Sequence, residues 1–148
     1  MITLRNFTDT DAQAYQQNYA CSMSLAEIRA LFAKWNGKQH AGSYFEMFAI
    51  VKDGAIVGQI SLYQLSKSMI SCGPEVFPAC RRQGIGAKAM RLAMDTASRM
   101  GYKTVLQQIR SDNTASIALH NRLGFETDGY PYKNKKGNDV GIYLKSLV

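Results

Sequence analysis

Hydrophobic and polar positions alternate along seven stretches of the chain, a pattern typical of β-strands. These stretches span residues 2–7, 44–52, 55–64, 69–76, 102–110, 125–130 and 140–147. Helical periodicity and capping residues predict four helices, at residues 9–20, 25–36, 83–100 and 114–123. The predicted order is therefore one strand, two helices, three antiparallel strands, a helix, a strand, a helix and two strands.

Capping and turn residues support several of these boundaries. Ser24 is followed three residues later by Glu27, which predicts a capping box at the start of the second helix. The pair Asp53-Gly54 predicts a two-residue hairpin. Residues 36–43 carry no pattern that predicts structure. Together these signals predict an α+β fold: a mixed, mostly antiparallel sheet of six to seven strands, flanked by about four helices.

Composition narrows the class of protein further. With 148 residues, 46% of them apolar, the chain fits one domain, residues 1–148. No apolar run reaches the roughly 18 residues that span a bilayer. The first residues show no secretory signal, so we expect a cytoplasmic protein without a membrane partner. Three widely spaced cysteines and two histidines predict neither a disulfide framework nor a metal site.

A formal charge of +7 predicts a basic surface that attracts anions, such as nucleic acid, acidic lipid or a phosphorylated cofactor. The segment 75–87 (EVFPACRRQGIGA) indicates which of these classes to favour. Two arginines stand before two glycines at a helix start, where backbone amides and the helix dipole attract phosphate. We therefore predict a pyrophosphate-binding turn.

Two motifs resemble those of the GNAT superfamily, the GCN5-related N-acetyltransferases. Residues 81–86 (RRQGIG) resemble its Arg/Gln-x-x-Gly-x-Gly/Ala signature. Residues 113–125 (NTASIALHNRLGF) resemble its Asn-x-x-Ala/Ser-x-x-Leu-Tyr-x-x-x-Gly-Phe segment, with some likeness to the branch that acetylates ribosomal-protein N-terminal alanines. The order of predicted elements is also similar to that of the superfamily.

The resemblance implies acetyl transfer from acetyl-CoA to an amine. It implies that the strand ending at Val76 binds the pantetheine arm, where the two central strands splay apart, and that the Val76 amide polarises the thioester carbonyl. Asn113 would contact the pantetheine region. Arg81 would occupy the first position of the signature. The pyrophosphate would be bound by the amides of the following residues: Arg82, Gln83, Gly84, Ile85, Gly86 and Ala87.

The catalytic positions depart from the family pattern. His120 stands where the family has a tyrosine that protonates the leaving thiolate, so it either takes over that role or only fills the tyrosine's place. Gln108 stands where N-terminal acetyltransferases carry a glutamate base. Glu75, next to Val76, is an alternative base, and a water chain ending at Gln108, Tyr130 or Tyr132 is another.

These observations predict an N-acetyltransferase in which a primary amine, on a small molecule or a protein N-terminus, attacks acetyl-CoA directly in a ternary complex. The missing tyrosine and glutamate motivate a non-catalytic acyl-CoA-binding domain as an alternative. The charge motivates a basic nucleic-acid-binding module as another, although we expect no nucleic-acid partner. The sequence does not identify the acceptor amine, and it leaves a homodimer open.

Overall fold

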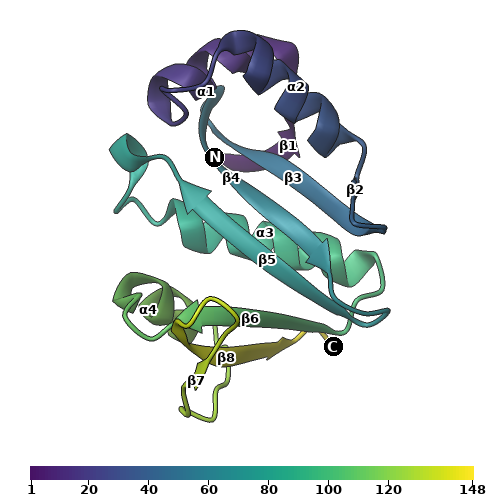
Figure 1. Ribbon diagram of the computed structural model, residues 1–148, viewed down its shortest axis with the longest axis vertical. Helices are drawn as coiled ribbons and strands as arrows, with labels where there is room; N and C mark the ends of the chain where they lie inside the picture. The colour runs from purple at the N-terminus through teal and green to yellow at the C-terminus, as the bar shows by residue number, and fades with distance from the viewer.

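One twisted sheet with strand order β1-β3-β4-β5-β6-β8-β7 runs through the molecule, and β2 pairs with β3 beside it (Figure 1). The structure is a computed structural model that describes residues 1–148. Neighbouring strands are antiparallel except for β5 and β6, which are parallel. The strands are β1 (Ile2–Asn6), β2 (Gln39–His40), β3 (Ser43–Lys52), β4 (Ala55–Gln64), β5 (Met69–Val76), β6 (Thr104–Arg110), β7 (Tyr132–Lys133) and β8 (Asp139–Ser146).

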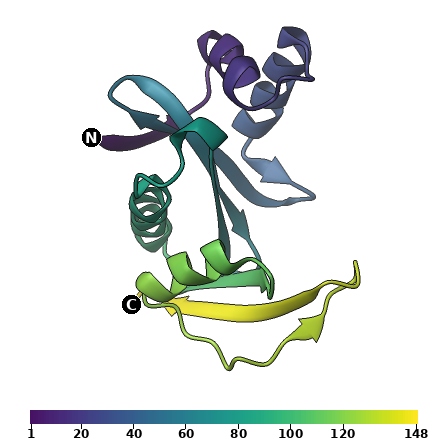
Figure 2. The same ribbon diagram turned by 90° about the vertical axis from the view of Figure 1, so that its left-hand side faces the viewer.

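Four α-helices cover the two faces of the sheet (Figure 2). On one face, α1 (Ala12–Asn18) and α2 (Leu25–Asn36) enclose an aromatic core around Phe7, in which Phe7 stacks on Phe32 with 4.5 Å between ring centroids. On the other face, α3 (Ile85–Arg99) and α4 (Thr114–Arg122) adjoin the larger core. Single turns of 3₁₀ helix, η1 (Asp9–Asp11) and η2 (Pro78–Cys80), precede α1 and α3. None of the helices has the length and hydropathy that a membrane span requires.

The α+β class, the mixed sheet and the four flanking helices are confirmed. The local signals also hold. The Ser24 hydroxyl accepts a hydrogen bond from the Glu27 amide at 3.1 Å, and the Glu27 carboxylate accepts one from the Ser24 amide at 3.0 Å. Asp53 and Gly54 both have positive φ, 51° and 84°, as the predicted two-residue hairpin requires.

The sheet has eight strands, more than the six to seven predicted, because two-residue strands add to its edges. One of them, β2, lies in the segment 36–43 that carries no sequence signal. It folds back on β3 through a turn in which Ala41 and Gly42 have φ values of 51° and 80°. An Ala-Gly pair is not among the common hairpin signals, because alanine rarely adopts positive φ.

The strand predicted at residues 125–130 is wrong. Only Glu126 pairs there, through two backbone hydrogen bonds to Leu144. Beyond it, the Thr127 hydroxyl and the Asp128 carboxylate accept hydrogen bonds from amides two residues ahead, at 3.2 and 2.9 Å. Such side-chain turns compete with a strand ladder, so pairing resumes only at β7.

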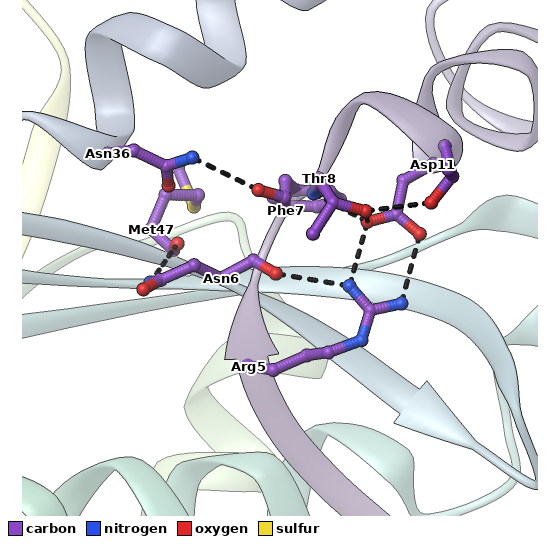
Figure 3. A network of polar contacts seen from close by, with 8 residues as sticks. Arg5, Asn6, Phe7, Thr8, Asp11, Asn36 and Met47 are labelled. Atoms are coloured by element: carbon purple, nitrogen blue, oxygen red, sulfur yellow. Dashed lines mark hydrogen bonds and ion pairs between the residues drawn. The ribbon is translucent and has the colours of Figure 1, made fainter.

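A polar network fixes the chain between β1 and α1 (Figure 3). The Arg5 guanidinium donates two hydrogen bonds to the buried Asp11 carboxylate, at 2.7 and 3.0 Å, and the Thr8 amide donates another at 2.8 Å. Nearby, the Asn36 side chain donates to the Phe7 carbonyl at 3.1 Å, which joins the end of α2 to the same segment. These contacts hold the two N-terminal helices against the sheet.

Asp11 should stabilise the fold in a pH-dependent manner. Its burial alone would raise the pKa of the carboxyl, but hydrogen bonds from Arg5 and Thr8 outweigh burial and lower that pKa. We expect Asp11→Asn to cost about 2 kcal/mol of unfolding free energy at pH 7, with Asp9→Asn as the exposed control. Because the folded pKa lies below the unfolded one, the stabilisation is complete above the unfolded pKa, about 4, and is lost as the pH falls through the folded pKa. Urea titrations of the wild type and both variants between pH 7 and pH 3 measure the unfolding free energies. If the difference between wild type and Asp11→Asn did not shrink as the pH falls, this prediction would be contradicted.

Candidate active site

The parallel strands β5 and β6 stay paired over a short distance only. Met69 pairs with Thr104 and Ile70 with Val105, and the ladder ends there. Figure 1 shows the two strands diverging toward the start of α3 and toward α4. A splay between the central strands, which the resemblance implied, is therefore present.

The divergence turns β5 into a local edge strand. Since neighbouring residues of an antiparallel strand alternate in direction, and the Phe77 amide bonds to Val57 of β4 at 2.9 Å, the Val76 amide points the other way, into the gap. Pro74, two residues earlier, has no N–H to offer. The Val76 carbonyl accepts a hydrogen bond from Arg81 Nε at 3.3 Å. Val76 is thus the residue whose N–H faces the gap at the end of β5.

The turn after β5 leads into an uncapped helix N-terminus. Gly84 is the N-cap of α3, with φ 73° and ψ 12°, and no side chain caps the first turn. The amides of Ile85, Gly86 and Ala87 have no intrahelical acceptors, because they belong to the first turn. Arg82 also has a positive φ, 65°, which is unusual for a residue with a side chain and typical of strained functional turns.

These groups border a pocket of about 950 Å³ between the start of α3 and one face of α4. Five cationic side chains and no acidic ones are among its lining residues. The lining residues are Val76, Cys80, Arg81, Arg82, Gly84, Ile85, Gly86, Ala87, Lys88, Arg91, Ala115, Ala118, Leu119 and Arg122. The pocket is suited to an elongated ligand with several negative charges.

Most of the predicted cofactor-binding residues meet at this pocket, and two do not line it. Gln83 accepts a hydrogen bond from Lys52 Nζ at 3.0 Å, so its side chain points to β3. Asn113 caps α4, where its side-chain oxygen accepts a hydrogen bond from the Ser116 amide at 3.1 Å. The other predicted members line the pocket: Val76, Arg81, Arg82, Gly84, Ile85, Gly86 and Ala87.

Sequence reasoning missed three of the cations. Lys88 and Arg91 follow Gly84 by four and seven residues, so they share its face of α3, a spacing that a search for basic residues along the helix would have found. Arg122 comes from α4, seven residues after Ala115. Its approach to α3 depends on tertiary packing, which no local pattern predicts.

His120 lies behind the pocket, with only 2% of its surface exposed, and is not part of the lining. Its Nδ1 lies 2.7 Å from the Ser116 carbonyl oxygen, and its Nε2 lies 3.2 Å from Nε2 of the Gln107 amide. Burial lowers the pKa of this imidazole, and the hydrogen bond to Ser116 offsets part of that effect. Both ring nitrogens already have protein partners.

Glu75 is exposed and lies on the opposite face of the sheet from the Val76 side chain, on the side of α1 and α2. It pairs across the strands with Gln59, whose side-chain oxygen accepts a hydrogen bond from the Tyr15 hydroxyl at 2.8 Å. Burial and the neighbouring Glu75 carboxylate raise the pKa of Tyr19 to about 12. Glu75 therefore belongs to a polar group that borders the gap from the face opposite the pocket.

Comparison with known proteins identifies the class. Residues 2–126 match the family described as the acetyltransferase (GNAT) domain. The chain therefore belongs to the acetyltransferase (GNAT) family, as the sequence resemblance predicted.

Individual relatives are distant. The [ribosomal protein bS18]-alanine N-acetyltransferase of Escherichia coli is 27% identical over 106 residues, which are 67% of this chain and 69% of the relative. The L-methionine sulfoximine/L-methionine sulfone acetyltransferase of Pseudomonas aeruginosa is 39% identical over 49 residues, 33% of this chain, and the match spans only 28% of that relative's length. The structure of yncA, a putative acetyltransferase from Salmonella typhimurium with its cofactor acetyl-CoA, shares the fold with a TM-score of 0.71 at 22% identity, over 100% of this chain and 95% of that one.

Gly86 offers a direct test of the pocket. A Cβ at this position would lie 3.7 Å from Leu119 and 3.9 Å from Val76, which are ordinary contacts. We therefore expect Gly86→Ala to fold and to bind coenzyme A within about threefold of wild type, whereas Gly86→Glu should weaken binding at least tenfold, because it adds a negative charge beside the anion. Isothermal titration with coenzyme A measures both. Equal affinities for the two variants would show that the anion binds elsewhere.

Proposed function

We propose that this protein transfers the acetyl group of acetyl-CoA to a primary amine, on a small molecule or a protein N-terminus, by direct attack in a ternary complex. One observation carries the proposal: the cationic pocket opens beside the unpaired edge of β5 at Val76. The residues present fit this cosubstrate. The uncapped amides of α3 suit a pyrophosphate, and the five cations match the high negative charge of coenzyme A.

The Val76 N–H is proposed to donate to the thioester carbonyl oxygen. Its direction into the gap supports this role, and Pro74 leaves no competing amide two residues away. A fixed donor of this kind stabilises the negative charge that develops on the oxygen as the amine attacks, an effect that is commonly 10²–10³-fold in rate. The Arg81 side chain, which bonds to the Val76 carbonyl, would have to move to leave that acceptor for the pantetheine arm.

Glu75 is proposed to take the proton from the attacking amine. It stands one residue before Val76 but faces the other side of the sheet, so an amine arriving from the side of α1 and α2 would meet the carboxylate as it reaches the thioester. Tyr15, Tyr19 and Gln59 border the same place and would form part of the acceptor site. A water chain ending at the exposed Gln108 is the alternative route for that proton.

For His120, the contacts favour filling the tyrosine's place over donating a proton. A neutral imidazole that donates from Nδ1 to Ser116 has no second proton, and burial opposes the doubly protonated form. We therefore propose that water protonates the leaving thiolate. Because both ring nitrogens of His120 are bound to protein groups, His120 also favours the alternative function, a non-catalytic acyl-CoA-binding or sensing domain.

The distribution of the basic residues favours a coenzyme over nucleic acid as the ligand. Five of them converge on one pocket, and the lysine-rich segment 133–136 forms part of a hairpin turn. In that turn the Asn134 side chain accepts hydrogen bonds from the amides of Lys136 and Asn138, both at 3.0 Å. The acceptors of the relatives, an N-terminal alanine and methionine sulfoximine, define two classes of amine to test.

The proposed activity separates from its alternatives in two measurements. Acetyl-CoA should raise the melting temperature of the protein, and thiol release should then follow addition of an amine from a panel of N-terminal peptides, amino-acid analogues and polyamines. Binding without thiol release from any amine would support the acyl-CoA-binding domain instead. Absence of any thermal shift would overturn both.

Replacing Glu75 tests the proposed base. With the best amine of the panel, we expect Glu75→Gln to lower kcat/KM by about 10²-fold or more, because general-base catalysis commonly contributes that much. Glu126→Gln, an exposed carboxylate distant in sequence from the gap, is the matched control. If Glu75→Gln retains the wild-type kcat/KM, as the control should, the base is another group.

A further inference from the structure

The Gln107 side chain occupies the place where pairing between β5 and β6 stops. In the register of the paired residues, Ile70 with Val105, the next outward position of β5 would be Cys72 opposite Gln107. The backbones have already separated there. Instead, the Gln107 side-chain oxygen accepts a hydrogen bond from the Cys72 amide at 2.9 Å, and the Gln107 side-chain nitrogen donates to the Cys72 carbonyl. One side-chain amide thus replaces one step of the strand ladder.

The same amide also reaches α4. Its second N–H points to His120 Nε2 at 3.2 Å, and its oxygen accepts a further hydrogen bond from the Ser71 hydroxyl at 3.0 Å. An amide side chain has two donors and two acceptor positions, so every one of them is used. Gln107 is 5% exposed, and losing any of these partners would leave a buried polar group unpaired.

The network determines the orientation of the amide and the tautomer of His120. A carbonyl oxygen can only accept, so the proton of the neutral ring lies on Nδ1, facing Ser116, and Nε2 must accept from Gln107. Turning the amide over would place its oxygen against two acceptors, the Cys72 carbonyl and His120 Nε2. The other rings that face the imidazole, Phe125 at 4.8 Å and Tyr143 at 6.3 Å between centroids, bring no charge.

We propose that Gln107 is a positioning residue for acetyl transfer, because its side-chain amide fixes both sides of the gap between β5 and β6. On one side it holds β5 four residues before Val76. On the other side it holds His120, whose neighbours Ala118 and Leu119 line the pocket. This inference rests on the proposed function. Displacements of about 1 Å can cost on the order of 10²-fold in rate, so the spacing of these walls matters for turnover.

Kinetics of two methionine variants test the positioning role. Gln107→Met keeps the length of the side chain and removes all four hydrogen bonds, so we expect kcat to fall by about 10- to 100-fold, with a smaller change in the dissociation constant for coenzyme A. Gln64→Met is the matched control, because it removes a hydrogen bond from Tyr102 (3.1 Å) at the opposite end of β4, and its kcat should stay at the wild-type value. A kcat for Gln107→Met within about threefold of the control would overturn the proposal.

Imidazole NMR tests the network itself and does not depend on turnover. Only His40 and His120 contribute signals, and a His40→Gln variant assigns them. The wild-type His120 ring should carry its proton on Nδ1; a proton on Nε2 would overturn the proposal. If the wild-type protein releases no thiol with any amine, the proposed function is refuted. The NMR measurement still tests the Gln107 network in that case.

The isosteric Gln107→Glu variant provides a second test of the proposal if Gln107→Met does not fold. It places a carboxylate where the amide N–H meets His120 Nε2, so the pKa of His120 should rise. Protonation of the ring then restores a donor between the two groups. We expect the rate of this variant relative to wild type to recover as the pH falls, and a ratio that stays constant with pH would overturn the proposal.

Discussion

The end of pairing between β5 and β6 is the constraint on which the rest of this structure depends. Two parallel strands in mid-sheet should continue their ladder, since every unpaired backbone group that is buried costs free energy. Here the ladder ends after two residue pairs. Side chains or turns must therefore supply hydrogen-bond partners for the backbone groups that the strands no longer pair. The Gln107 amide, the uncapped start of α3 and the cationic faces of α3 and α4 all lie along that opening. The proposed functional site therefore lies where the sheet lacks a continuous ladder.

Local signals in the sequence were sufficient to predict most of the helices and strands. Asp53-Gly54 and the Ser24–Glu27 capping box work through neighbouring residues, so their effect can be read without a tertiary structure. The signal for the predicted pyrophosphate-binding turn is also local, because two glycines and two arginines lie within six residues. By contrast, residues 125–130 have the composition of a strand, but the Asp128 turn prevents it, and β2 forms without any turn signal of the usual kind.

Residues that act across the fold were the ones the sequence could not assign. Arg122 joins the pocket only because the fold places α4 across the pocket from the start of α3. His120 occupies the motif position of an acid, but its partners come from Ser116 on its own helix and from Gln107 on β6, thirteen residues away. Gln107 itself carries no motif, because a buried glutamine in a strand resembles any polar residue of an alternating pattern. Its importance depends on where β5 leaves β6, which is a property of the whole sheet.

An open strand edge in the middle of a sheet is also a hazard, because it can pair with a strand of another molecule. Most of the outward groups of β5 in the gap are occupied or missing. The Cys72 amide and carbonyl are bound by Gln107, Pro74 has no N–H, and the Val76 carbonyl is covered by Arg81. Among the N–H groups that point outward at Cys72 and Val76, only that of Val76 has no partner, and a single donor is too little to template a strand. The gap can therefore accept one extended ligand with amides of its own while resisting aggregation through the same edge.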